Sequence, residues 1–208
     1  MYKKLDDGRI NSILETGIDE FAANGLDRSN INLIAKNAGV SVGVIYKYFG
    51  DKDGFFLACV RHSLDLLDEV LHDAVSYETD IASGIRSIVS ALIRHCEEHA
   101  NYNILYNEIS SGSCRQYAKE LAFEIETRTA AVYSQLLQNA KSAGKADCDL
   151  DPKLFAFFMD NLFMMLQFSY SCDYYKERMK IFCGDDIFDD TDKMTEEFMR
   201  FIMNALKA

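Results

Sequence analysis

Apolar residues recur every three or four positions along most of the chain, which is the spacing of one face of an α-helix. A first run stops at Asn24-Gly25, a helix C-cap signal. This run consists of Ile10, Ile13, Leu14, Gly17, Ile18, Phe21 and Ala22. Comparable runs predict helices over residues 51–71, 81–96, 102–109, 115–142, 151–168 and 194–206. With two short helices before residue 50 and no long alternation of apolar and polar residues, the pattern predicts an all-α protein of about nine helices.

The helix predicted at 151–168 carries apolar residues almost all the way round. It opens with Asp151-Pro152, a capping acid followed by proline in the first turn. A helix that is apolar on every side must be buried on every side. One side can face its own domain, and a second copy of the chain is the simplest cover for the other. We therefore expect a homodimer in which this helix and the one at 194–206 form a four-helix interface from two chains.

The segment INLIAKNAGVSVGVIYKYFGDK, residues 31–52, has the features of a helix-turn-helix. Ala35 allows two helices to approach closely, Gly39 supplies the positive φ of the turn, and Ile45 anchors the second helix in the core. Ser41 can cap that second helix. Its outward side would carry Val42, Gly43, Tyr46 and Lys47. The small residues at its start would let it press into a DNA major groove.

The same segment resembles the signature of the TetR (tetracycline-repressor-like) regulators. The run AGVSVGVIYKYFGDK, residues 38–52, is similar to the family pattern in which A-G-V-S-x-G precedes Y-x-Y-F-x-x-K. After about Leu57 the chain is similar to the family only in length and helical layout. The resemblance implies a helix-turn-helix DNA-binding domain at residues 1–52, which is a three-helix head, and a larger helical ligand-binding and dimerisation domain at 53–208.

For function, the resemblance implies a ligand-responsive transcriptional regulator, above all a repressor that a small-molecule effector releases from a palindromic double-stranded DNA operator. It places phosphate contacts at Lys47 and Lys52. Tyr48 is a further candidate for a DNA contact, but it could equally be an aromatic residue of the core. The candidate DNA-binding residues are Ser29, Asn30, Ser41, Val42, Gly43, Tyr46, Lys47, Tyr48 and Lys52. The chain departs from the family pattern at Leu33, where a polar residue is usual, and at Gly54 in the first turn of the next helix.

The formal net charge of −11 by itself argues against nucleic acid as a partner. Its distribution matters more, because residues 1–60 hold seven Lys/Arg and eight Asp/Glu, a net of −1. Residues 61–208 hold fifteen Lys/Arg and twenty-five Asp/Glu, a net of −10. The acidic part therefore lies away from the motif, which predicts salt-dependent DNA binding with little non-specific affinity.

Aromatic and methionine side chains in the second part of the chain suggest an effector pocket enclosed by the helices between residues 81 and 168. The candidates are Tyr102, Tyr106, Tyr117, Phe123, Tyr133, Phe158, Met165 and Phe168. Each of them alone is equally well explained by core packing. The nearby cations are Arg86, Arg94, His95 and Arg128, in a domain that is acidic as a whole, so a neutral or cationic ligand is favoured over a strongly anionic one.

No catalytic or cofactor site is indicated, because the chain shows no nucleophile with a base and no phosphate-cradling glycine loop. His95 and His99 lack a third ligand at metal spacing, so they predict no metal site. The six cysteines are far apart and predict small buried hydrophobic residues in a reducing cytoplasm. No membrane span is expected. The alternative that the sequence leaves open is a helical small-molecule-binding or scaffold protein without working DNA recognition.

Overall fold

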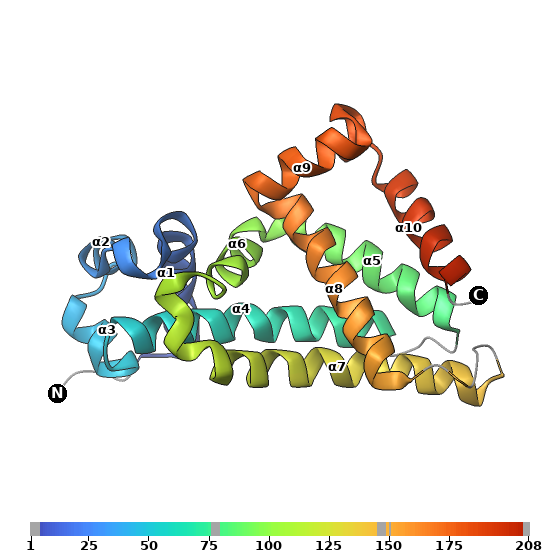
Figure 1. Cartoon of the computed structure of the whole chain (residues 1–208). Coiled ribbons are helices and arrows are strands. Elements are labelled where there is room, and N and C mark those ends of the chain that lie inside the picture. Colours follow the sequence, from blue (N-terminus) through green and yellow to red (C-terminus); the bar gives the residue numbers. More distant parts are fainter. Residues whose placement is uncertain (1–4, 76–79, 145–148, 150, 206–208) are drawn as a thin grey trace.

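The computed structural model describes residues 5–75, 80–144, 149 and 151–205, and within them it contains ten α-helices and no strand (Figure 1). The prediction of an all-α fold is confirmed. The helices are α1 Asp7–Arg28, α2 Ile31–Asn37, α3 Val42–Phe49, α4 Lys52–Val75, α5 Ile81–Glu98, α6 Ala100–Glu108, α7 Ala118–Ser142, α8 Pro152–Ser171, α9 Asp173–Cys183 and α10 Thr191–Ala205. Two short 3₁₀ helices, η1 Gly112–Tyr117 and η2 Asp185–Phe188, connect some of them.

Helix α9 is the element that the apolar pattern does not predict. Within α9 only Met179 is buried, whereas Tyr174, Ile181 and Phe182 are exposed, so its apolar residues form no inward stripe. The segment 184–192, which precedes the helix predicted at 194–206, contains η2 and the first turn of α10. At Gly25, where α1 was expected to end, φ is 71° and the helix bends before it continues to Arg28.

Helices α1 to α3 and the first half of α4 form the head at one end of the molecule (Figure 1). Phe21, Phe55 and Phe56 are fully buried in its core, with ring centroids of Phe21 at 5.7 Å from Phe55 and 5.2 Å from Phe56. The same core continues into α6, η1 and α7 through buried residues such as Leu105 and Leu121. A second core lies among α5, α7, α8 and α10.

Helix α4 belongs to both cores. Its residues Phe55 to Leu64 pack in the head, and Leu67 and Leu71 pack in the second core. It lies beside α7 along the length of the molecule, while α8 crosses over and packs on α5, α6 and α7 (Figure 1). The boundary predicted between residues 52 and 53 coincides with the start of α4, but this helix is continuous across both cores, so the domain boundary stays a prediction.

Polar contacts also fasten the head to α6. Glu108 accepts a hydrogen bond from the Leu26 backbone amide at 3.3 Å, and the Asn101 amide donates to Asp19 at 2.6 Å. The hydroxyl of Tyr102 donates to the carboxylate of Glu15. These three contacts link α6 to α1.

Candidate nucleic-acid interface

Helices α2 and α3 and the turn between them have helix-turn-helix geometry. Ala35 and Ile45 are buried, which holds both helices against the head core. Gly39 has φ 63°, a value that suits glycine, and the amide of Val40 donates to the carbonyl of Ala35 at 2.9 Å to close the turn. Arg9 of α1 donates to the Gly39 carbonyl at 2.9 Å and fixes the turn on the head. The three roles assigned from sequence to Ala35, Gly39 and Ile45 match their positions.

The outer side of α3 is open to solvent. Tyr46 is 41% exposed, and Gly43 and Lys47 are also exposed. Ser41 occupies the N-cap position with extended φ and ψ, and its side chain makes no capping hydrogen bond. Val42 is half-buried against the head core at the same end of the helix. The N-terminal end of α3 thus presents small side chains and one hydroxyl outward.

Gly43 and Gly54 are required for different reasons. A Cβ at Gly54 would lie 2.2 Å from the carbonyl oxygen of Phe49, so only glycine allows α4 to begin so close to the end of α3. This explains the departure from the family pattern at that position. A Cβ at Gly43 would meet nothing closer than the Ser41 Oγ at 3.8 Å, so nothing inside the chain requires glycine there. A glycine on an open helix surface suits the close approach of an external molecule.

Some of the candidate DNA-binding residues already have partners within the chain. Ser29 is buried, and its hydroxyl donates to the carbonyl of Gly25 at 2.5 Å. The side chain of Asn30 accepts from the amide of Asn32 at 2.9 Å and caps α2. The hydroxyl of Tyr48 accepts from the amide of Leu5 at 2.7 Å.

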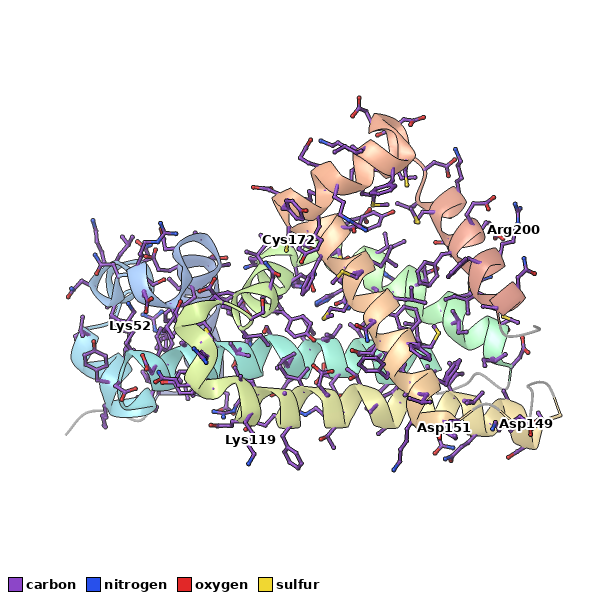
Figure 2. All side chains as sticks on the ribbon, in the orientation of Figure 1. Lys52, Lys119, Asp149, Asp151, Cys172 and Arg200 are labelled. Carbon is purple, nitrogen blue, oxygen red and sulfur yellow. The ribbon has the colours of Figure 1, made fainter. Side chains whose placement is uncertain are left out.

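Lys52 donates to the carbonyl of Asp27 at 2.9 Å near the end of α1, and Figure 2 shows it at the head end of the molecule. The ammonium group of Lys47 lies 5.8 Å from the centre of the Tyr48 ring. Leu33 is 41% exposed on α2 and Lys36 is exposed on the same helix. Leu33 stands where the family pattern usually has a polar residue. Lys36, a basic residue close to the turn, is not among the DNA-binding residues predicted from the sequence.

The model of the family described as "Bacterial regulatory proteins, tetR family" matches residues 13–59, which cover α1, α2, α3 and the start of α4. The helix-turn-helix head of this chain is therefore of the TetR type. A curated TetR-type relative, the HTH-type transcriptional regulator BetI of Burkholderia lata, is 40% identical over 89 residues. That alignment covers 42% of this chain and 42% of BetI, so the chain matches less than half the length of this relative.

Two solved structures of TetR-type regulators share the fold over nearly the full length. The regulator CifR, in a cysteine mutant complexed with a 26-base-pair operator DNA, has a TM-score of 0.73 at 14% identity, covering 96% of this chain and 98% of CifR. FadR from Bacillus subtilis, in complex with stearoyl-CoA, has a TM-score of 0.71 at 17% identity, covering 90% and 96%. At such low identity these neighbours establish the fold of this chain and nothing about its ligands.

The candidate effector-binding residues separate into several places. Tyr106, Tyr133 and Phe168 are gathered among α6, α7 and α8, where the Tyr106 and Phe168 ring centroids are 5.6 Å apart and Met165 is half-buried nearby on α8. The hydroxyl of Tyr106 contacts the Met164 sulfur at 3.7 Å. These side chains occupy the interior that the sequence reasoning assigned to an effector, although their use by a ligand stays a prediction.

The other four candidates point elsewhere. Phe123 and Phe158 are exposed on α7 and α8. Tyr117 donates to Asp53 at 2.5 Å, and Tyr102 packs against the ring of His99 with centroids 4.8 Å apart. Side-chain identity alone does not reveal these directions, because an aromatic residue in a helix satisfies the same apolar period whether it faces a cavity, a core or a partner.

A carboxyl pair lies beside Tyr106. Burial, with a smaller contribution from the nearby charge of Asp160, raises the pKa of Glu126 to about 7. Burial also raises the pKa of Asp160, while a hydrogen bond from Thr129 opposes this change. The two carboxyl groups therefore share a proton more readily than isolated ones do.

Metal and redox chemistry receive no support from the described part of the chain. No group of three or more His, Cys, Asp or Glu side chains with metal-binding geometry occurs within it. Cys59, Cys96, Cys114 and Cys172 are buried and free, and Cys183 is free and exposed. Burial raises the pKa of Cys96 and Cys172 to about 11, which keeps both thiols protonated and unreactive. Cys148 lies outside the described residues. None of the described helices has the length and apolar character of a membrane span.

Proposed function

We propose that this TetR-family chain is a homodimeric transcriptional repressor that binds a palindromic double-stranded DNA operator and is released from it by a small-molecule effector. Its activity is binding rather than catalysis, and its place of action is the cytoplasm. The observation that carries the proposal is the open N-terminal end of α3, with an exposed glycine that the fold does not require. The operator complex of the structural neighbour CifR supports the same use of the fold.

In the proposed complex, α3 enters the major groove with its N-terminal end. Val42, Gly43 and Tyr46 meet base edges, where apolar and small contacts favour thymine methyl groups. Lys47 and Lys52 contact phosphates, and the hydroxyl of Ser41 is free to donate to another. Ser29, Asn30 and Tyr48 hold the head in shape through their internal hydrogen bonds and contribute to the complex by positioning α2 and α3.

Dimerisation is supported by apolar side chains left exposed on α8 and α10. These are Leu154, Phe157, Phe158 and Phe201. Leu154, Phe158 and Phe201 also line a cavity of about 410 Å³ between the two helices, which are joined through α9 and η2 (Figure 1). A second copy of the chain would remove this apolar surface from water.

The effector is proposed to act through α4, because this helix is shared by both cores. A ligand that prefers one position of the second half of α4 shifts the head between an operator-competent and an incompetent arrangement. By linkage, operator DNA and effector must weaken one another by the same factor. The stearoyl-CoA complex of the structural neighbour FadR supports a ligand-binding role for this fold.

The proposal is tested by changing Gly43 and a matched glycine. Gly112 in η1 is also exposed, and a Cβ there would meet nothing within 4 Å. Gly43→Gln should abolish operator binding in a gel-shift assay at low salt, while Gly112→Gln should bind like the parent and both variants should keep the parent melting temperature. Equal DNA binding by Gly43→Gln and the parent would remove α3 from the interface. Failure of the parent to bind any DNA would favour the scaffold alternative.

A further inference from the structure

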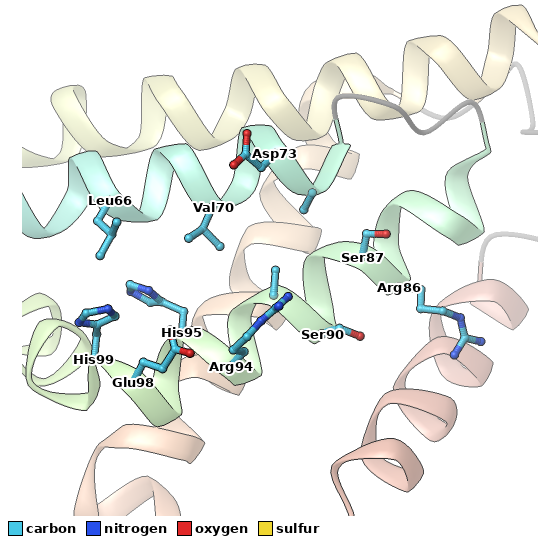
Figure 3. Close-up of a pocket in the computed structure, with 12 residues that line it drawn as sticks. Leu66, Val70, Asp73, Arg86, Ser87, Ser90, Arg94, His95, Glu98 and His99 are labelled. Atoms are coloured by element: carbon cyan, nitrogen blue, oxygen red, sulfur yellow. The ribbon is translucent and has the colours of Figure 1, made fainter.

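A groove of about 720 Å³ runs between α4 and α5, on residues that the DNA-binding proposal does not use (Figure 3). None of the eight effector-binding residues expected from sequence lines it. Leu66 and Val70 point from α4 toward α5, and Arg94, His95 and His99 face them from α5 and its C-terminal end. The groove therefore has one apolar wall and one polar wall. Its volume is that of a site for a small organic molecule.

His95 is the buried polar group of this groove. It is 3% exposed, and its ring lines the groove. Its ring contacts are His99 at 5.2 Å and Tyr102 at 6.1 Å between centroids. Burial, with a smaller contribution from His99, lowers the pKa of His95 to about 4, so the imidazole is neutral near pH 7. A neutral imidazole offers one N–H donor and one acceptor to a molecule bound in the groove.

Arg94 extends into the groove beside His95 (Figure 3). Other arginines on these helices are paired: Arg86 binds Glu196 at 2.5 Å and Arg61 binds Glu124 at 2.8 Å. Arg94 has no carboxylate at ion-pair distance among the residues that the structure describes. Its guanidinium can only donate hydrogen bonds, so a ligand group that meets it must accept them.

We propose that this groove binds an amphipathic organic monocarboxylate, with the carboxylate between Arg94 and His95 and the apolar body along Leu66 and Val70. The proposal rests on the effector role proposed above and supplies the site and chemical class of the effector. Two acceptor oxygens satisfy the guanidinium and the imidazole N–H together. The acidic charge of the whole domain had favoured a neutral or cationic ligand, but the two donors that line this groove, exposed Arg94 and buried His95, decide locally what binds.

Glu98 limits the ligand to one negative charge. It is exposed on α5 one turn beyond Arg94 and also lines the groove. A second carboxylate on the ligand would approach it, whereas a single carboxylate at Arg94 leaves it solvated and screened. Asp73 lines the groove from α4, but its carboxylate points away from α5 in Figure 3. Monocarboxylates should therefore bind more tightly than dicarboxylates of equal length.

The experiment uses the full chain with ¹³C-labelled histidine, because it contains four histidines and two of them line the groove. Titration with decanoate should shift the ring signals of His95 and His99 and leave that of His72, which is exposed near the end of α4, unchanged. Decanamide and decylamine have the same apolar body and serve as the matched probes. Saturating decanoate without a shift at His95, or equal shifts with decylamine, would overturn the proposal.

Two variants separate the groove from the rest of the chain. Arg94→Gln should weaken decanoate binding about ten- to a hundredfold in isothermal titration calorimetry, because it removes a charge-assisted hydrogen bond. Arg115→Gln, at an exposed arginine of η1, should bind like the parent. Equal affinity of Arg94→Gln and the parent would place the carboxylate elsewhere. If decanoate shifts His95 but leaves operator affinity unchanged, the groove site stands and the effector role fails.

Discussion

Gly17 offers the sharpest test of how the head is joined to α4. A Cβ at this position would lie 2.6 Å from the Phe55 Cζ and 2.7 Å from the Cys59 Sγ. The Phe55 ring cannot swing aside, because it is fully buried and lies 5.7 Å from the Phe21 ring and 4.8 Å from the Phe49 ring. Gly17→Ala must therefore push α1 and α4 apart.

The expected magnitude is a balance of two effects. Replacing glycine by alanine inside a helix stabilises it by about 1 kcal/mol. Overpacking a tight core costs about 1–3 kcal/mol, and here a ring and a sulfur are both contacted, so the upper part of that range applies. Gly17→Ala should lower the free energy of unfolding by about 1–2 kcal/mol.

Gly84→Ala is the matched control. A Cβ at Gly84 would lie 2.5 Å from the Leu136 Cδ1, the flexible end of a single side chain that can change rotamer. Its cost should nearly cancel the gain in helix propensity, leaving stability within about 1 kcal/mol of the parent. Urea denaturation followed by far-UV circular dichroism measures both variants. A Gly17→Ala protein as stable as the parent, or more stable than Gly84→Ala, would refute the close α1–α4 packing.

Three further outcomes are expected. Lys47→Ala and Lys52→Ala should each weaken binding to all DNA sequences and reduce the slope of log affinity against log salt concentration by about one unit. Fluorescence anisotropy measures these slopes, and unchanged slopes would show that neither lysine contacts a phosphate. Phe201→Asp should convert a dimer into a monomer in light scattering. Phe123→Asp, at another exposed ring on α7, should leave the dimer intact. A monomeric parent would rule out the proposed interface. Burial lowers the pKa of His95 from its ordinary 6.5 to about 4 in the folded chain, so the unfolded chain takes up this proton at a higher pH than the folded chain does. The free energy of unfolding should therefore fall by up to about 3 kcal/mol as the pH drops from 6.5 to about 4. His95→Phe should flatten that decline in urea titrations, and an identical pH profile would show that the imidazole is solvated.

Local chemistry explains why the head was predictable from sequence. The positive φ of Gly39 and the burial of Ile45 are set by nearby residues in the chain, so residue types and spacing are enough to predict them. The same holds outside the head for the capping of α8 by Asp151. The need for glycine at position 54 is different, because it arises from the approach of the Phe49 carbonyl across the junction of α3 and α4.

The second part of the chain was predictable in its helices but less so in its surfaces. Helix α9 has no inward apolar stripe, so periodicity has no signal to detect there. The direction of Phe123 into solvent depends on which helices pack beside α7. From sequence, His95 was one of the cations near the expected pocket, but only the packing of α4 against α5 shows that its buried imidazole faces a groove between these two helices.

Operator recognition by a symmetric dimer is tested most directly by selecting bound sequences from random double-stranded DNA with the full-length protein. The structure predicts enrichment of one inverted repeat, whose half-sites are separated by about one or two helical turns, as two copies of α3 in adjacent major grooves require. Enrichment should disappear with Gly43→Gln and persist with Gly112→Gln. A selection that yields no preferred sequence, or a single half-site without its inverted copy, would contradict operator recognition by a symmetric dimer.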